Sequence, residues 1–148
     1  MDKKTLLFLQ QLRENSREKL TEISKKTKIP ISTLFDLLHE LQGKAITKNT
    51  ILLNFSELGY HTRAQVFLKV AKEDKDKLKQ HLFFHQNVNT LYKINNGWDF
   101  ILETAHKNIK ELDLFLDHLN EKFKVEDKQI HYVIDEIKRE GFVLEQSL

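Results

Sequence analysis

The spacing of the hydrophobic residues changes near Ile46, and this change constrains the fold more than any other feature of the 148-residue chain. Before Ile46, apolar residues recur every three or four positions, as they do on amphipathic helices. After it, stretches in which apolar and polar residues alternate are interleaved with two longer helical patterns. This order predicts an α+β protein of two small domains, residues 1–53 and residues 54–148.

Composition excludes several classes of protein. The chain contains no cysteine, which excludes disulfides, thiolate metal sites and cysteine nucleophiles. No apolar stretch approaches the roughly 20 residues that span a bilayer, and the start Met-Asp-Lys-Lys-Thr lacks the apolar core of a signal peptide. We therefore expect a cytoplasmic protein with no membrane partner.

The two halves of the chain differ in the sign of their charge. Up to Thr50 there are ten basic and six acidic side chains, a net charge of +4, whereas the whole chain carries only +2. The remainder is therefore slightly acidic. A positive N-terminal half is compatible with nucleic-acid binding, although a solvated charged surface is the alternative interpretation.

Three short helices are predicted in the first fifty residues. They cover residues 3–14, 19–27 and 32–42; the second ends before Pro30, because proline disfavours a helical residue ahead of it. Ser32 is the expected N-cap of the third helix, and Gly43 its C-terminal stop. The residues expected to face the core are Leu6, Leu9, Leu12, Leu20, Ile23, Leu34, Leu37, Leu38 and Leu41, with Phe8 at the flank of the first helix.

Two short helices joined by a tight turn, packed on a first helix and followed by a hairpin predicted over residues 46–53, form a winged helix-turn-helix. Such a domain places the N-terminal side chains of its last helix on base edges in the major groove, while flanking cations contact phosphates. That helix contains no arginine for bidentate contact with guanine. The candidate DNA-binding residues are Arg17, Lys25, Lys26, Lys28, Ser32, Thr33, Asp36, His39, Lys44 and Lys48.

The remaining residues predict the order strand, helix, strand, strand, helix, strand. The strands are marked by alternation over residues 64–70, 88–94, 98–102 and 130–134, and Asn96-Gly97 is a hairpin signal. The helices cover residues 75–85 and 109–123; the apolar positions of the second are Ile109, Leu112, Leu116, Leu119 and Phe123. This is the ferredoxin-like βαββαβ fold, in which both helices cover one face of an antiparallel sheet. An open apolar face predicts a homodimer formed sheet to sheet.

Several stretches resemble, in order and spacing, the feast/famine (Lrp/AsnC) family of regulators. Residues 15–17, Asn-Ser-Arg, look like that family's Asn-Ala-Arg, and residues 58–60 match its Leu-Gly-Tyr. Residues 85–88, His-Gln-Asn-Val, resemble its His-Pro-x-Val, with glutamine in place of proline, and residues 97–99 resemble its Gly-x-Asp hairpin. Thr33-Leu34, followed by Leu38 and Leu41, is similar to its recognition helix.

The resemblance implies DNA-binding transcriptional regulation by dimers that assemble further, to tetramers or octamers, and modulation by an amino acid or a similar metabolite. The chain departs from the family's pattern at three places. Asp36 and Leu37 stand where arginines are common, Lys28 and Pro30 where the turn often has glycine and serine, and Asn96 where threonine often precedes the hairpin glycine.

The expected hairpin turn supplies the candidate effector-binding residues Asn96, Gly97, Trp98 and Asp99. For Gly97, the positive φ of a tight turn is a sufficient structural reason. The carboxylate of Asp99 is suited to an amino group of a ligand, or equally to the amides of its own turn. For Trp98, packing in the core or at an interface is the favoured interpretation.

No pattern in the sequence indicates catalysis. His81 and His85 have the i, i+4 spacing of metal ligands but lack a third ligand, so we favour a solvated helix face and expect neither metal nor cofactor. There is no nucleophile with its base and no phosphate-binding glycine loop, so we do not expect an enzyme. Two alternatives stay open: an assembly module that no longer reads DNA, and an enzyme like the sirohaem decarboxylases, which share this two-domain architecture.

Overall fold

The computed structural model describes residues 1–144, which divide into two compact units. The first unit combines residues 1–52 with the segment that begins at Lys138, and the second is Leu53–Ile137. The expected second domain was residues 54–148, whereas the segment from Lys138 belongs to the first unit; residues 145–148 lie outside the described part. The segment after Lys138 groups with the first unit because Arg13 Nη2 donates hydrogen bonds to the backbone oxygens of Glu140 and Phe142, at 2.7 and 3.1 Å.

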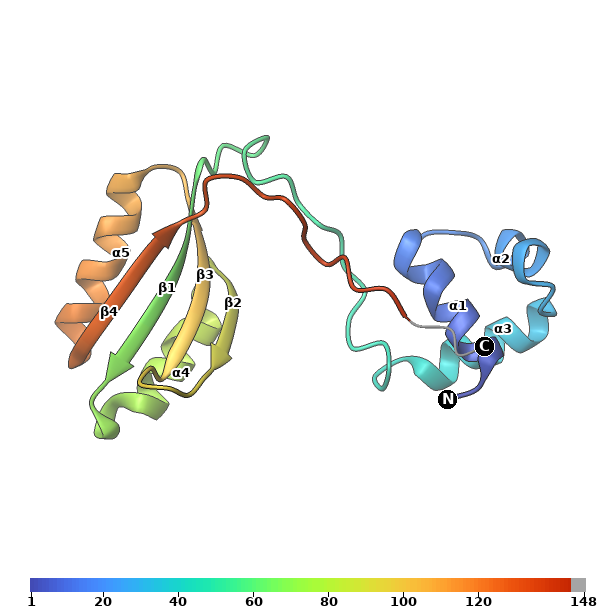
Figure 1. The fold of residues 1–148 in the computed structure, drawn as a ribbon, viewed down its shortest axis with the longest axis horizontal. Helices are drawn as coiled ribbons and strands as arrows, with labels where there is room; N and C mark the ends of the chain where they lie inside the picture. The colour runs from blue at the N-terminus through green and yellow to red at the C-terminus, as the bar shows by residue number, and fades with distance from the viewer. Residues whose placement is uncertain (145–148) are drawn as a thin grey trace. The chain divides into compact units, whose positions relative to one another are not determined.

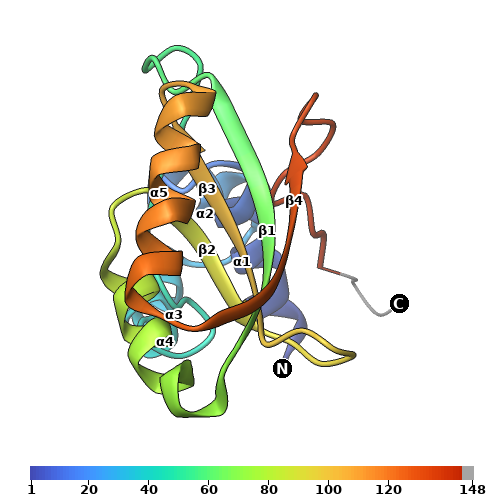
Figure 2. The same ribbon diagram turned by 90° about the vertical axis from the view of Figure 1, so that its left-hand side faces the viewer.

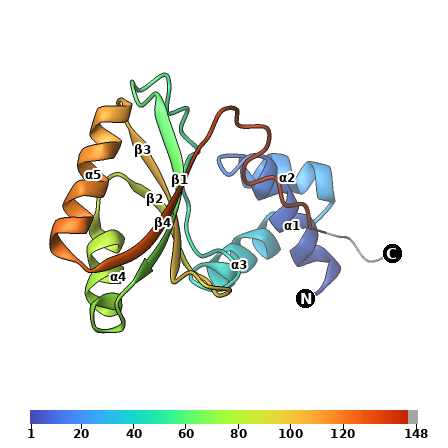
Figure 3. The same cartoon turned by 60° about the vertical axis from the view of Figure 1, so that its left-hand side comes forward.

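The first unit contains three helices, α1 (Lys3–Glu14), α2 (Leu20–Thr27) and α3 (Ile31–Leu41), seen in blue and cyan in Figure 3. The carboxylate of Asp2 caps α1 by accepting a hydrogen bond from Thr5 N at 2.8 Å, and this bond lowers the pKa of Asp2. The prediction that Ser32 caps α3 is wrong. Pro30 is the N-cap residue, and its carbonyl accepts the first helical bond from Leu34 N at 3.1 Å, which places Ser32 inside the helix.

The core of the first unit is centred on Phe8, which is fully buried instead of lying at the flank of α1. It packs with buried residues from α2, α3 and the turn between them: Ile23, Ile29, Leu34 and Leu41. The other leucines that were predicted to face the core are partly buried around this cluster: Leu9, Leu12, Leu20, Leu37 and Leu38. Leu6 is not part of the cluster. The phenylalanine occupies the centre because the larger ring fills the space between three short helices.

The predicted hairpin over residues 46–53 is not formed. Ile46 makes only an isolated bridge to Gln42, and residues 47–54 contain no strand. In place of a wing, Ile46 N donates to Leu41 O at 3.0 Å and Gly43 N donates to Ile46 O at 2.9 Å, which closes the end of α3. The sequence offers a reason: the apolar residues Ile51, Leu52 and Leu53 are consecutive and do not alternate, so no single face would be buried.

The second unit confirms the βαββαβ fold (Figure 1). Its elements are β1 (Thr62–Val70), the short 3₁₀ helix η1 (Lys72–Asp74), α4 (Lys75–Phe84), β2 (Val88–Lys93), β3 (Phe100–His106), α5 (Ile109–Lys122) and β4 (Val125–Tyr132). The four strands form a sheet in the order β2-β3-β1-β4, and every pair is antiparallel.

Both helices cover the same face of the sheet, as Figure 2 shows. The alternating residues of β1 that face the helices are all buried, and they pack with Leu78 and Leu82 of α4 and with four residues of α5. One predicted core position of α5 is wrong: Ile109, the first residue of the helix, is exposed, and Phe115, which was not predicted, is buried. Ile134 lies beyond the end of β4 and is also exposed. Within residues 1–144, no helix has the length and hydropathy needed to cross a membrane.

Candidate nucleic-acid interface and β2–β3 loop

The turn between α2 and α3 is held by three side-chain and backbone bonds. Lys28 adopts the left-handed conformation (φ 60°) that ends α2, and its N–H donates to Ser24 O at 2.8 Å. Ser24 Oγ donates to Ile29 O at 2.6 Å, and Thr27 Oγ1 donates to Ile23 O at 2.7 Å. With Ile29 buried in the core, these bonds fix the angle at which α3 leaves the turn. The Lys28 side chain stays exposed.

The outward face of α3 is made of the residues predicted for it. Ser32, Asp36, His39 and Glu40 are exposed and Thr33 is half-buried. Two further residues on this face were not predicted. Ile31 and Phe35 are large and apolar, and they are 47% and 53% exposed. The sequence contained a signal for them, because the stripe formed by Leu34, Leu37, Leu38 and Leu41 leaves both positions outside the core.

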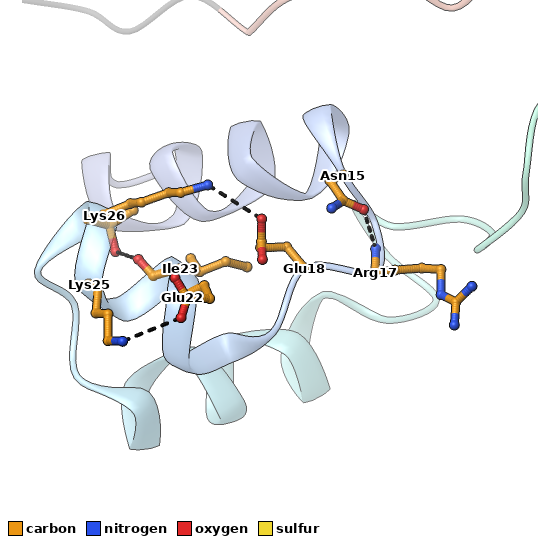
Figure 4. Close-up of polar contacts among 8 residues, drawn as sticks. Asn15, Arg17, Glu18, Glu22, Ile23, Lys25 and Lys26 are labelled. Atoms are coloured by element: carbon orange, nitrogen blue, oxygen red, sulfur yellow. Dashed lines mark hydrogen bonds and ion pairs between the residues drawn. The ribbon is translucent and has the colours of Figure 1, made fainter.

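The predicted phosphate-binding cations all lie on the surface, and two of them pair with glutamates of the same unit (Figure 4). Lys25 Nζ is 3.4 Å from Glu22 Oε1, and Lys26 Nζ is 3.4 Å from Glu18 Oε2. Exposed ion pairs of this kind contribute only about 0–1 kcal/mol, so a phosphate can replace the glutamate at small cost. Figure 4 shows the guanidinium of Arg17 extending away from the helices, while its backbone N–H donates to Asn15 Oδ1 at 3.0 Å. The remaining exposed cations are Lys28, Lys44 and Lys48.

The predicted two-residue turn is present at Asn96 and Gly97, which have φ values of 65° and 92°. However, β2 ends one residue earlier than predicted, at Lys93, and β3 begins later, at Phe100. The connection therefore spans six residues from Ile94 to Asp99, and it is closed by a hydrogen bond from Ile94 N to Asp99 O at 3.1 Å. Trp98 lies in this loop and not in a strand. Asn96 and Gly97 are exposed at its tip.

Both carboxylate oxygens of Asp99 have partners inside the second unit. Oδ2 accepts from Val70 N at 2.9 Å, and Oδ1 is 3.1 Å from Lys75 Nζ. Burial raises the pKa of Asp99, but the Val70 and Lys75 contacts outweigh it, so the pKa is lowered overall. The sequence left open whether Asp99 binds a ligand or bonds within the protein. The structure shows bonds within the protein, but their partners lie in β1 and α4 and are not the amides of the turn.

The face of the sheet opposite the helices has an aromatic centre. The Phe67 ring lies 5.6 Å from the Trp98 ring and 5.8 Å from the His131 ring, measured between centroids. Ile101 pairs with both Phe67 and Tyr92 across the strands, so their side chains share this face, and Tyr92 is exposed. This open aromatic face is hereafter the set Phe67, Tyr92, Trp98, Ile101 and His131.

Next to the open aromatic face, Arg63 is paired with two carboxylates. Arg63 is mostly buried and makes 2.8 Å ion pairs with both Glu103 and Glu136, and its guanidinium carbon lies 4.9 Å from the centre of the Phe55 ring. Burial lowers the pKa of Arg63, and the two carboxylates outweigh this effect, so its pKa is raised. The positive charge of Arg63 is therefore taken up by the two glutamates.

Curated relatives of this chain are transcriptional regulators. An uncharacterised HTH-type transcriptional regulator of Pyrococcus furiosus is 24% identical over 146 residues, which is 98% of this chain and 96% of that protein. The HTH-type transcriptional regulator FL11 of Pyrococcus abyssi is 28% identical over 107 residues, or 72% of this chain and 71% of that protein. No protein-family model matches the chain.

Solved structures share the fold over nearly the whole chain. LrpC of Bacillus subtilis has a TM-score of 0.83 at 19% identity, with 93% of this chain and 97% of that chain covered. A transcriptional regulator of Neisseria meningitidis, solved as a complex with L-methionine, has a TM-score of 0.86 at 22% identity and covers 94% and 93% of the two chains. In sequence the chain is similar to HTH-type transcriptional regulators, and it shares the fold of solved Lrp/AsnC regulators.

The expectation that His81 and His85 lie on a solvated helix face is wrong. The rings of His81 and His85 are 5.7 Å apart and half-buried; His81 packs on Phe123, and His85 packs on Phe115. Burial lowers the pKa of both histidines. Among residues 1–144, no three metal-binding side chains come together.

Sequence reasoning also missed His106, which is 2% exposed, with its ring centroid 5.3 Å from that of Phe115. Its pKa is lowered by burial, against the opposing charge of Glu111. No hydrogen-bond partner reaches its Nε2 within the described residues. A histidine at the end of a strand gives no sequence signal of burial, because histidine is common both on surfaces and in cores.

Proposed function

We propose that this protein is a regulator of the Lrp/AsnC type that binds duplex DNA as a homodimer and performs no catalytic step. In this proposal residues 1–53 read DNA, and residues 54–148 form the dimer and hold a small effector. The single observation that carries it is the outward face of α3, whose side chains are left exposed by the fold and are flanked by exposed cations.

The roles within the reading unit follow from side-chain chemistry. Contacts from cations to phosphates supply affinity without sequence information, and we assign them to Arg17, Lys25, Lys26, Lys28, Lys44 and Lys48. Side chains on the outward face of α3 supply base contacts, and we assign these to Ser32, Thr33, Asp36 and His39. Asp36 has the chemistry to accept a hydrogen bond from the amino group of cytosine, which a duplex presents in the major groove.

The open aromatic face supports the dimer. Tyr92 is exposed on this face and Phe67 and Trp98 are half-buried, and aromatic residues of this kind are typical of the centre of a protein interface. A twofold axis through this face would relate two reading units, which suits a pseudo-palindromic site with half-sites roughly 34 Å apart. Sedimentation at micromolar concentration is expected to give the mass of two chains or an even multiple of it. A monomer under these conditions would remove the dimer from the proposal.

For the effector, we propose an amino acid. The support is that the Neisseria meningitidis neighbour and a feast or famine regulatory protein of Mycobacterium tuberculosis are both solved with L-methionine. The candidate residues are those of the β2–β3 loop, Asn96, Gly97, Trp98 and Asp99, of which Asn96 and Gly97 are the exposed ones. Titration calorimetry with the twenty amino acids tests this. If none of them binds while DNA binding is intact, the proposal of an amino-acid effector at this loop is overturned.

One experiment tests DNA binding directly. Purified protein is incubated with fragmented genomic DNA at low salt, with and without a mixture of amino acids, and the retained fragments are sequenced. The proposal predicts retained fragments that share a pseudo-palindromic motif. Retention of no duplex at low salt would overturn it.

An assembly module that does not read sequence is the second candidate, because acidic Asp36 and Glu40 are exposed on the reading face of α3. Their charge opposes the approach of phosphate. This candidate predicts retention of fragments without a shared motif, or none at all. Sharp motif-centred binding in a genome-wide map would exclude it.

A further inference from the structure

Two large apolar side chains project from α3 where a DNA-reading helix needs polar groups. Ile31 and Phe35 are 47% and 53% exposed and lie one helical turn apart. The helix cannot rotate to bury them, because its other side already places Leu34 and Leu41 in the core of the unit. An isolated exposed hydrophobic residue needs no explanation, but two neighbours on the N-terminal half of such a helix form a continuous apolar surface.

This surface is also ordered. The Phe35 ring is stacked on the His39 ring, with 5.1 Å between centroids and 28° between planes. Ile31, Phe35 and His39 are therefore successive i, i+4 neighbours along one side of α3, and the stacking restricts the rotamers of the phenylalanine. We call these three residues the α3 ridge. A restrained side chain loses little entropy when it binds a partner.

The surroundings of the α3 ridge favour DNA over a protein partner. Lys25, Lys26 and Lys28 precede α3, Lys44 and Lys48 follow it, and all five are exposed. These exposed cations oppose burial against most protein surfaces and suit contact with phosphates, and they outnumber the exposed acids of α3, Asp36 and Glu40. Next to the open aromatic face of the second unit, Arg63 is instead paired with both Glu103 and Glu136.

The major groove presents one prominent apolar group, the C5 methyl of thymine, and side chains such as phenylalanine contact it. Within α3, from Ile31 to Leu41, no arginine, lysine, asparagine or glutamine offers a bidentate contact to a purine. We propose that Ile31 and Phe35 read thymine methyl groups, so that each half-site is selected for A·T pairs at the positions beneath the α3 ridge. This inference rests on the proposed DNA-binding function and adds the chemical group that is read.

The methyl group can be removed without changing the base pair. The preferred duplex is first selected from a random library, and each thymine is then replaced in turn by deoxyuridine, which lacks only the methyl. At one or two positions of each half-site, the wild-type protein is expected to lose affinity by about three- to fivefold, the factor for one methyl-sized apolar group. The remaining thymines should show no effect.

A variant series locates the contact. Phe35→Ala is expected to bind the thymine duplex about tenfold more weakly and to bind the thymine and deoxyuridine duplexes equally. The matched control is Phe84→Ala, which removes an exposed phenylalanine of α4 in the second unit and should keep the full thymine preference. Circular dichroism and thermal melting check that each variant is folded, and the deoxyuridine scan of the wild-type protein stands even if a variant does not fold.

The outcomes distinguish the two levels of the proposal. If no duplex binds at low salt, the proposed function fails. If a duplex binds with sequence preference but every deoxyuridine replacement is silent, the proposed function stands and methyl reading is overturned. A Phe35→Ala protein that keeps both its DNA affinity and its thymine preference would likewise overturn the inference, and would assign the α3 ridge to a protein partner instead.

Discussion

The open aromatic face of the sheet and the outward face of α3 both expose large apolar side chains, yet they differ in the charges beside them. Next to the sheet face, Arg63 is paired with two glutamates at 2.8 Å. Around α3, lysines are exposed, and the ion pairs they make are long, at 3.4 Å. An apolar surface with neutralised charges suits a second protein surface, whereas an apolar surface with available positive charge suits DNA. The difference between the two faces therefore supports the proposal that the second unit forms the dimer and the first unit reads DNA.

The largest expected effect comes from a charge placed in the open aromatic face. Phe67→Glu buries an unpaired carboxylate in the proposed dimer, so the protein should sediment as a monomer. DNA affinity should fall by roughly a hundredfold or more, because two linked reading units bind far more tightly than one. Gln80→Glu, which adds the same charge at an exposed position of α4, is the control. A Phe67→Glu protein that remains dimeric would break the assignment of this face to assembly.

A smaller effect is expected at Asp99, and it separates a structural role from an effector role. Asp99→Ala removes the acceptor of Val70 N and the partner of Lys75, so the free energy of unfolding should fall by about 1–3 kcal/mol. Urea denaturation measures this, with Asn95→Ala at an exposed position of the same loop as the comparison. Unchanged stability together with lost effector binding would reverse the role that we give to Asp99.

A third prediction concerns backbone strain in the turn before α3, which should lower the stability of the first unit. Lys28 has a φ of 60°, which an L residue adopts with strain and glycine adopts freely. Lys28→Gly should therefore stabilise the first unit by about 1 kcal/mol and at the same time weaken binding to all DNA sequences equally. Lys28→Asn, which tolerates this conformation but lacks the charge, isolates the electrostatic part. A destabilised Lys28→Gly protein would contradict this reading of the turn.

The two units also differ in whether they bury a histidine. His39 of the first unit is exposed, whereas the second unit buries His106 near His85 and Glu111. His118 and Lys122 of α5 lie near His85 and His81, respectively. Because the folded pKa of His106 lies below its unfolded value of about 6.5, the unfolded chain binds more protons there. The contribution of His106 to the free energy of unfolding is therefore fully present above its unfolded pKa, and it is lost as the pH falls through its lower folded pKa.

Urea denaturation between pH 7.5 and pH 5.5 measures this dependence, and His106→Gln should reduce its slope. The acidic side chains titrate mostly near pH 4 and contribute little in this window. Stability of the second unit that is constant or increases toward pH 5.5 would show that burial does not control the titration of His106.

The sequence predicted most elements of both units because their apolar spacing is local information. The stripe from Leu34 to Leu41 and the alternation from Ala64 to Val70 each fix a buried face without knowledge of the rest of the chain. The expected hairpin after Ile46 was wrong because its residues lack such a pattern: apolar and polar residues do not alternate clearly there. Ser32 was mistaken for a cap because Pro30 ends the turn two residues earlier than serine chemistry indicated.

The contacts that decide the roles of the two units could not be predicted. Arg63 meets Glu103 and Glu136 from 40 and 73 residues away, and Asp99 meets Val70 across 29 residues. Such pairs depend on the register of β1 against β3 and on the path of the chain after β4, which no local pattern encodes. The exposed pair Ile31 and Phe35, in contrast, could have been inferred from the leucine stripe of α3.

The most direct test of the central claim, that the cations around α3 bind phosphate, is the dependence of DNA affinity on salt. The logarithm of affinity should fall linearly with the logarithm of salt concentration, with a slope of about −0.9 for each phosphate neutralised. In the double variant Lys25→Ala and Lys26→Ala, the slope should become less steep by about two such increments, while the control Lys77→Ala and Lys79→Ala on α4 should leave it unchanged. A slope near zero for the wild-type protein, or an equal slope in the Lys25 and Lys26 variant, would contradict this account.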